Sequence, residues 1–160
     1  MQKIVFSEWD KPEINIFYSL PTQITENTKV IFVIHGNSRN ADGYLNVWMK
    51  LARKHNVLLI APEFNKSNFP SYNTLMMSTS NGKIRENKDL YLHNSIDLFF
   101  DYFINKFELK ADKYIIYGHS GGSQFVHRYL LMSDNPKVDK AVAANAGWYT
   151  FLHGAPFPYG

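Results

Sequence analysis

Two continuous apolar runs limit the folds open to this chain more than any other feature. Residues 29–34 (Lys-Val-Ile-Phe-Val-Ile) and 57–61 (Val-Leu-Leu-Ile-Ala) show no alternation of polar and apolar side chains. Strands of this composition are buried on both faces, which is typical of parallel sheets covered by helices on each side. Segments with helical spacing of apolar residues follow the runs, so the sequence predicts an α/β fold with three layers, α/β/α, and a mostly parallel sheet.

Weaker patterns complete the expected order of elements within a single domain of residues 1–160. Further strands are expected over 13–19 (an outer strand), 113–117 and 140–145, and helices over about 42–55, 88–108 and 120–133. The stretch between 65 and 87 holds Asn, Ser, Thr, Gly and Pro without periodicity. Connections of that length are usually functional or mobile.

A serine motif joins the strand expected at 113–117 to the following helix. Residues 118–122 (Gly-His-Ser-Gly-Gly) fit G-x-S-x-G, the tight turn that presents a nucleophilic serine, here Ser120, at the edge of a sheet. Side chains at Gly118 or Gly122 would collide with the strand or the helix. The alternative is a glycine-rich turn that only packs strand against helix, but the strand–turn–helix context favours the nucleophile. A phosphate-binding loop is disfavoured because no Lys-Ser or Lys-Thr follows the glycines.

A second loop supplies the oxyanion donors that such a serine requires. Residues 34–39 (Ile-His-Gly-Asn-Ser-Arg) come directly after the first apolar run. Backbone N–H groups aimed at the tetrahedral intermediate form an oxyanion hole. We expect Gly121 to give one N–H and Asn37 the other, while Gly36 lets the chain turn. His35 and His119 are expected to shape the two turns.

Four segments carry a family resemblance: residues 34–44, 59–64, 117–125 and 144–149. On these segments the chain resembles the α/β-hydrolases, and among them the polyhydroxybutyrate-depolymerase-like and feruloyl-esterase-like branch. The resemblance implies that Ser120 is the nucleophile and that a small ester or acyl substrate binds at the carboxyl ends of the strands. It also implies that Trp148 and Tyr149 lie near the acyl or alcohol pocket. Arg39 is a further candidate substrate contact, with a solvated surface role as the alternative.

The catalytic carboxylate and histidine are harder to find. In α/β-hydrolases they follow the serine along the chain. Asp134 and Asp139 come after Ser120, but they are expected at the far end of a helix and at the opposite edge of the sheet. His127 lies two turns into the helix, about 10 Å of rise from the serine, and is expected to be a partly buried or surface helix residue. His153 follows the last strand and is the remaining candidate base, although it comes one or two strands early for the family.

The chain is therefore expected to be the amino-terminal part of a longer hydrolase. Its last apolar strand, at 140–145, would then be an open edge, and we expect it to pair with another copy or to aggregate. The expected function is a serine hydrolase of carboxylic esters working through an acyl-enzyme on Ser120, with acid and base outside this segment and little activity in the isolated chain. A catalytically inactive binding or scaffold protein is the alternative. Thioesterase, peptidase and deacetylase chemistry stay open.

Composition excludes several other classes. The net charge of +3 comes from 17 basic and 14 acidic residues without a run of like charges, which disfavours a nucleic-acid or membrane-surface partner. The absence of cysteine excludes disulfides, thiolate metal sites and cysteine nucleophiles. No metal cluster or cofactor motif is found, so no cofactor or metal is expected. No signal segment or membrane span is found either, and a cytoplasmic location is expected, or a secreted one if a leader has been removed.

Overall fold

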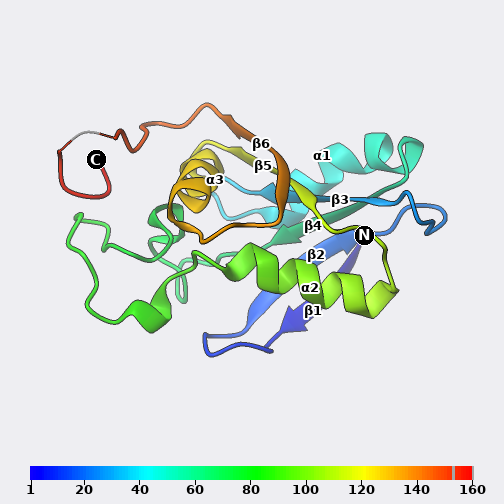
Figure 1. Cartoon of the computed structure of the whole chain (residues 1–160), viewed down its shortest axis with the longest axis horizontal. Helices are drawn as coiled ribbons and strands as arrows, with labels where there is room; N and C mark the ends of the chain where they lie inside the picture. The colour runs from blue at the N-terminus through cyan, green and yellow to red at the C-terminus, as the bar shows by residue number, and fades with distance from the viewer. Residues whose placement is uncertain (153, 160) are drawn as a thin grey trace.

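A mixed six-stranded sheet forms the centre of the molecule (Figure 1). The computed structural model describes residues 1–152 and 154–159. The sheet order is β1-β2-β4-β3-β5-β6. The elements are β1 (Gln2–Phe6), β2 (Ile14–Ser19), β3 (Lys29–Ile34), α1 (Ala41–Lys54), β4 (Val57–Pro62), α2 (Ser95–Phe107), β5 (Tyr114–His119), α3 (Gly121–Met132) and β6 (Val138–Ala144). The pairs β3–β4, β3–β5 and β5–β6 are parallel, which confirms the predicted class.

The antiparallel end of the sheet departs from the sequence prediction. The strand expected over 13–19 is present as β2, but it is not the outer strand, because β1 pairs with it from the outside. β1 buries only its last residue, Phe6, and its other side chains are exposed or half-exposed. A strand that buries one side chain has too little apolar pattern to stand out in the sequence.

The helix expected over 88–108 begins later, at Ser95. A single 3₁₀ turn covers Lys88–Leu90, and Tyr91 is extended. The N–H of Leu92 donates to the carbonyl of Leu75, 2.9 Å away, so this residue is tied to the 65–87 loop and not to a helix. Leu92 is apolar because it is buried under this loop. Its spacing of four residues from Ile96 therefore does not mean that it belongs to the helix.

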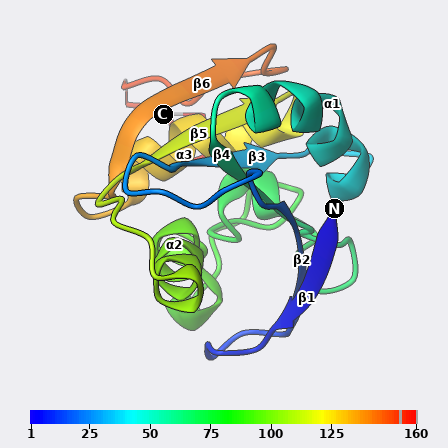
Figure 2. The same cartoon turned by 90° about the vertical axis from the view of Figure 1, so that its right-hand side faces the viewer.

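Helices cover both faces of the sheet, as the three-layer prediction required (Figure 2). α1 packs on one face, over Val33 and Leu59. α2 and α3 pack on the other face, where the larger and strongly aromatic part of the core lies. α1 covers only part of its face, because Val142, which shares the face and register of Val33, is 49% exposed. Within the described residues no helix is both long and apolar enough to cross a bilayer.

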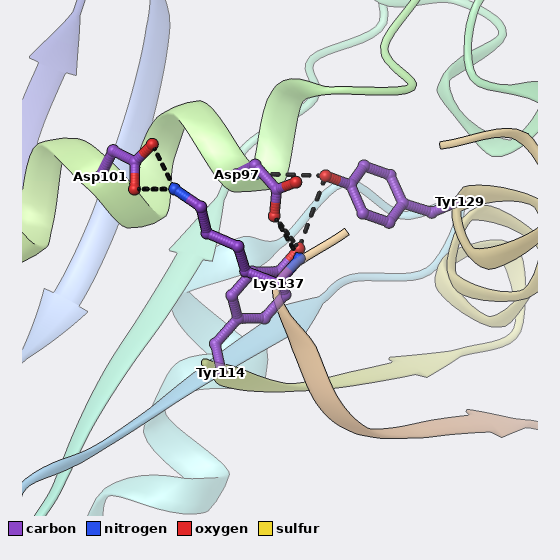
Figure 3. Close-up of polar contacts among 5 residues, drawn as sticks. All are labelled: Asp97, Asp101, Tyr114, Tyr129 and Lys137. Carbon is purple, nitrogen blue, oxygen red and sulfur yellow. Dashed lines mark hydrogen bonds and ion pairs between the residues drawn. The ribbon is translucent and has the colours of Figure 1, made fainter. Parts of the chain in front are cut away.

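A polar network fixes α2 against α3 and the sheet (Figure 3). The Tyr114 hydroxyl donates to Asp97 Oδ1 at 2.7 Å, and the Tyr129 hydroxyl accepts from the Asp97 N–H at 3.1 Å. The N–H of Lys137 donates to the same Asp97 oxygen at 3.1 Å. Burial raises the pKa of both tyrosines, that of Tyr129 to about 12, so both hydroxyls stay protonated near pH 7. The network therefore fixes the position of α3, the helix that follows Ser120.

Candidate functional site

Ser120 occupies a strained turn between β5 and α3. Its backbone angles are φ 57° and ψ −118°, a region that costs a residue with a side chain on the order of 1–3 kcal/mol. The turn is held from both sides, because the Ser120 N–H donates to the Ala144 carbonyl at 3.0 Å and the Ser120 carbonyl accepts from the Gln124 N–H at 3.2 Å. A Cβ at Gly122 would meet the carbonyls of Ile34 and His35. The glycines thus allow the turn to lie directly on the end of β3.

The loop after β3 lies against this turn. A Cβ built on Gly36 would stand 3.5 Å from the Cβ of Ser120, and the side chain of Asn37 lies against Gly121. In the described part of the chain, no group accepts a hydrogen bond from the N–H of Asn37 or of Gly121. Two uncommitted backbone donors therefore stand on the two loops that meet at Ser120.

His35 is a structural residue of this loop. It is fully buried, its Nδ1 lies 2.8 Å from the Gly36 carbonyl, and its Nε2 accepts from the Phe64 N–H at 3.0 Å. This pattern fixes the neutral tautomer with the proton on Nδ1. Burial lowers the pKa of His35 to about 4, so the ring is neutral near pH 7. With both nitrogens engaged, His35 has none left for Ser120.

His119 shapes the other side of the turn. Its Nδ1 lies 2.9 Å from the hydroxyl of Tyr44, a residue of α1. The same Tyr44 hydroxyl would lie 2.9 Å from a Cβ at Gly36. His119 and Tyr44 also line a shallow depression on the α1 side of the sheet, together with Trp48 and Tyr117. His119 thus ties the turn to α1.

Tyr72 is a site residue that sequence reasoning missed. It is fully buried, and its hydroxyl donates to the His35 carbonyl at 2.8 Å. A Cβ at Gly121 would stand 2.6 Å from that hydroxyl, so Tyr72 packs directly against the turn. It sits in a 3₁₀ turn, Tyr72–Thr74, inside the 65–87 loop, which has no periodic pattern that would single it out. The loop is therefore a wall of the site.

Arg39 holds that wall in place. It has a positive φ of 61°, and its guanidinium stacks 4.1 Å above the Tyr72 ring. Its Nη1 donates to the carbonyls of Phe64 and Phe69, the latter at 2.9 Å, and its Nη2 donates to the Pro70 carbonyl at 3.0 Å. Arg39 is half-buried, so the alternative of a solvated surface role does not describe it.

The segment after β6 forms the opposite wall and is anchored by α3. Arg128, fully buried on α3, stacks 4.0 Å over the Trp148 ring and donates from Nε to Thr150 Oγ1 at 2.9 Å. His127 uses both ring nitrogens, one with the Ser123 carbonyl at 2.9 Å and one accepting from the Thr150 N–H at 3.0 Å. His127 is thus more than the partly buried or surface helix residue expected from sequence. In the fold Arg128 and His127 fasten the 145–152 segment to the helix that carries Ser120.

Between the two walls lies a cavity of about 560 Å³, and Asn37 of the oxyanion loop is one of the residues that line it. One side comes from Arg39 and the 65–87 loop, and the other from Trp148 with Pro158 and Tyr159. The structure thus brings Asn37, Arg39 and Trp148 together. Tyr149 does not line this cavity, because its ring packs on His127, 5.0 Å between centroids.

No described histidine reaches Ser120 by a hydrogen bond, since His35 and His127 are engaged elsewhere. His55 caps the far end of α1. The carbonyl of His93 accepts from Ser133, at the end of α3 and about 20 Å of helix rise from Ser120. His153 lies outside the described residues, so its role as a base stays a prediction. Among the carboxylates, Asp139 lines a depression with Lys29 and Lys113 at the amino ends of the parallel strands, opposite the serine.

No protein-family model matches the sequence, and no curated protein matches it. Solved structures do resemble it. Poly(aspartic acid) hydrolase-1 from Sphingomonas sp. KT-1 is 36% identical with a TM-score of 0.92, over 99% of this chain and 61% of that one. LpqC, a poly(3-hydroxybutyrate) depolymerase from Bordetella parapertussis, is 27% identical with a TM-score of 0.88, over 99% of this chain and 56% of that one.

More distant structures share the fold alone. FphF, a fluorophosphonate-binding serine hydrolase from Staphylococcus aureus, is 19% identical with a TM-score of 0.65, over 91% of this chain and 56% of that one. The chain spans 61% and 56% of the length of the two more similar structures. This chain therefore corresponds to little more than half of each of these proteins.

Proposed function

The chain belongs to the α/β-hydrolase superfamily, and from this premise we propose that it is a serine hydrolase whose nucleophile is Ser120. The substrate would be a carboxylic ester or a related acyl compound. The observation that carries the proposal is the position of Ser120 in a strained turn, beside two loops that offer uncommitted N–H groups at Asn37 and Gly121. Strain of this kind persists where the surrounding structure enforces it, and it is concentrated at functional sites.

The proposed reaction proceeds in two steps. Ser120 Oγ attacks the substrate carbonyl carbon, its proton passes to a base, and the carbonyl oxygen becomes an oxyanion that accepts hydrogen bonds from Asn37 and Gly121. Collapse of this intermediate breaks the ester bond, and the alcohol leaves with a proton from the base. Water then attacks the acyl-enzyme by the same route, releasing the acid and restoring Ser120. One such oxyanion donor contributes on the order of 10²–10³ in rate.

We propose that the base is not among the described histidines. His35 and His127 engage both ring nitrogens in structural hydrogen bonds. His119 engages Nδ1 with Tyr44, and among the described residues no histidine is hydrogen-bonded to Ser120. Free imidazole then provides a test, since it can act as the base in solution. The rate of p-nitrophenyl butyrate hydrolysis by the chain, minus the rate of Ser120→Ala, should rise with imidazole concentration. Ser7→Ala, a change at an exposed serine, should behave as wild type. A difference that stays at zero at all imidazole concentrations would contradict the proposal.

The similar structures suggest which polymers to test. Their names give an amide-linked polymer, poly(aspartic acid), and an ester-linked one, poly(3-hydroxybutyrate). Both linkages can be cleaved by the same acyl-transfer steps. We propose short oligomers of each as the first substrates, with release of new carboxyl groups as the measure of cleavage.

A second function is favoured by one observation, the absence of a histidine hydrogen-bonded to Ser120 among residues 1–152 and 154–159. It is a binding protein that keeps the pocket of the fold without its chemistry. The two functions differ in one measurement. A binding protein retains affinity for the oligomers while Ser120 stays unmodified by activated esters with and without imidazole.

A further inference from the structure

The cavity beside Asn37 has an uneven charge. Arg39 and Lys66 line it, and none of its lining residues is an Asp or a Glu. Within the described part of the chain, the ion pairs are Lys11 with Asp10 and Lys137 with Asp101, so neither cavity cation is paired. At about 560 Å³ the cavity falls in the range of sites for small organic ligands, which is larger than a single ion requires.

Arg39 contributes charge as well as support. Of its five N–H groups, two on Nη1 and one on Nη2 donate to loop carbonyls, and the Nε–H is buried without a partner. One Nη2 N–H is left for a ligand. Carbonyl oxygens satisfy its hydrogen bonds but do not neutralise it, so the cavity wall keeps a full positive charge.

Arg128 adds a second uncompensated charge behind the cavity. Its Nη1 donates at 2.7 Å to the carbonyl of Asn73, a lining residue, and its guanidinium stacks on Trp148, another lining residue. Its Nη2 is buried and has no partner among the described residues. A buried guanidinium without a carboxylate is costly, and an anion in the adjoining cavity would lower that cost.

Lys66 differs from both arginines. It is exposed on the 65–87 loop, no hydrogen bond or ion pair engages its ammonium group in the described residues, and it lines the cavity. All three of its donors are free for a ligand. Lys66 can be replaced without disturbing the wall that Arg39 holds.

We propose that this cavity is a substrate subsite that recognises a carboxylate carried by the substrate near its scissile carbonyl, with Lys66 as the side chain that discriminates charge. The inference rests on the proposed function of Ser120, because it places the carboxylate relative to the oxyanion loop at Asn37. Arg39 and Arg128 supply the positive potential, and Trp148 covers the apolar part of the substrate. Neutral substrates of the same shape bind the same cavity more weakly.

Binding tests the subsite without any turnover. The chain is titrated with tri-aspartate and with tri-asparagine, a neutral peptide of nearly the same shape, and the dissociation constants are measured by NMR. Tri-aspartate should bind more tightly, and Lys66→Met should weaken it about fivefold, the scale of one exposed charge pair. Lys66→Glu should weaken it about tenfold or more because it also adds repulsion. Lys83→Met is the matched control, since it removes the same charge from the same loop but lies outside the cavity, and it should change binding less than about twofold. Equal losses in Lys66→Met and Lys83→Met would overturn the subsite.

A pair of activated esters separates this inference from the proposed function. p-Nitrophenyl butyrate and the p-nitrophenyl monoester of succinate differ mainly in a terminal carboxylate. In the presence of imidazole, the acylation rate of Ser120 by the succinate ester, divided by its rate with the butyrate ester, should fall about fivefold in Lys66→Met. The same ratio should stay unchanged in Lys83→Met. If the butyrate ester acylates Ser120 but the ratio ignores Lys66, the subsite is wrong and the proposed function stands. If tri-aspartate binding depends on Lys66 but neither ester acylates Ser120, the cavity binds carboxylates but is not a substrate subsite, and the proposed function fails.

Discussion

Backbone strain at Ser120 leads to a stability prediction that can be worked from the structure. At φ 57° and ψ −118°, a residue with a Cβ carries on the order of 1–3 kcal/mol of strain, which glycine avoids. Glycine also loses more conformational freedom on folding, which costs about 0.5–1 kcal/mol relative to alanine. Ser120→Ala and Ser120→Gly both lack the hydroxyl, so their difference isolates these two effects. We expect Ser120→Gly to be more stable than Ser120→Ala by about 1 kcal/mol.

The assay is urea unfolding of both variants, with free energies compared at equal m-values. Ser133, the residue after α3, provides the control because its φ of −79° is ordinary. There the same comparison should have the opposite sign, with the glycine variant less stable than the alanine variant by about 0.5–1 kcal/mol. If glycine is no more stable than alanine at Ser120, the turn is not strained and the argument for an enforced serine loses its basis.

Three further predictions concern the surroundings of the site. Because burial lowers the pKa of His35 from 6.5 to about 4, the unfolded chain binds a proton at pH 4.5 that most native chains do not, so stability is lost as the pH falls. Between pH 7 and 4.5 the wild type should lose about 2–3 kcal/mol more than His35→Asn in urea unfolding, and equal losses would contradict the buried neutral ring. Tyr114→Phe, which removes a 2.7 Å hydrogen bond to Asp97, should lower the free energy of unfolding by about 1.5 kcal/mol, and a change under about 0.3 kcal/mol would mean that the network is not needed. The open edge at β6 should make the chain associate in light scattering at high concentration, and Val142→Lys should reduce this, whereas a monodisperse wild-type monomer would refute it.

The elements that sequence reasoning placed correctly are those with one dominant signal. The runs at 29–34 and 57–61 became β3 and β4, side by side at the centre of the sheet, because a strand without polar residues can be stable only when both faces are covered. The turn at 118–122 was placed between strand and helix by the G-x-S-x-G motif, and in the structure a Cβ at Gly122 would meet the carbonyls at the end of β3. In both cases the local sequence pattern and the tertiary packing favour the same conformation.

The missed features depend on contacts between distant segments. β1 is held by pairing with β2 and has almost no pattern of its own. Tyr72 and Arg128 matter because the fold buries them beside residues far away in sequence, and arginine in a helix usually indicates an exposed face. The 65–87 loop was noticed for its length alone. Its role as a cavity wall comes from hydrogen bonds to residues far away in sequence, among them Arg39 and Arg128.

The central claim is that Ser120 is a nucleophile, and a covalent adduct tests it most directly. The chain is incubated with a fluorophosphonate and imidazole, digested, and analysed by tandem mass spectrometry over time. If Ser120 is the nucleophile, one dominant adduct is expected, on Ser120, with no comparable labelling of Ser120→Ala. Labelling spread over other serines, or equally fast in Ser120→Ala, would contradict that claim.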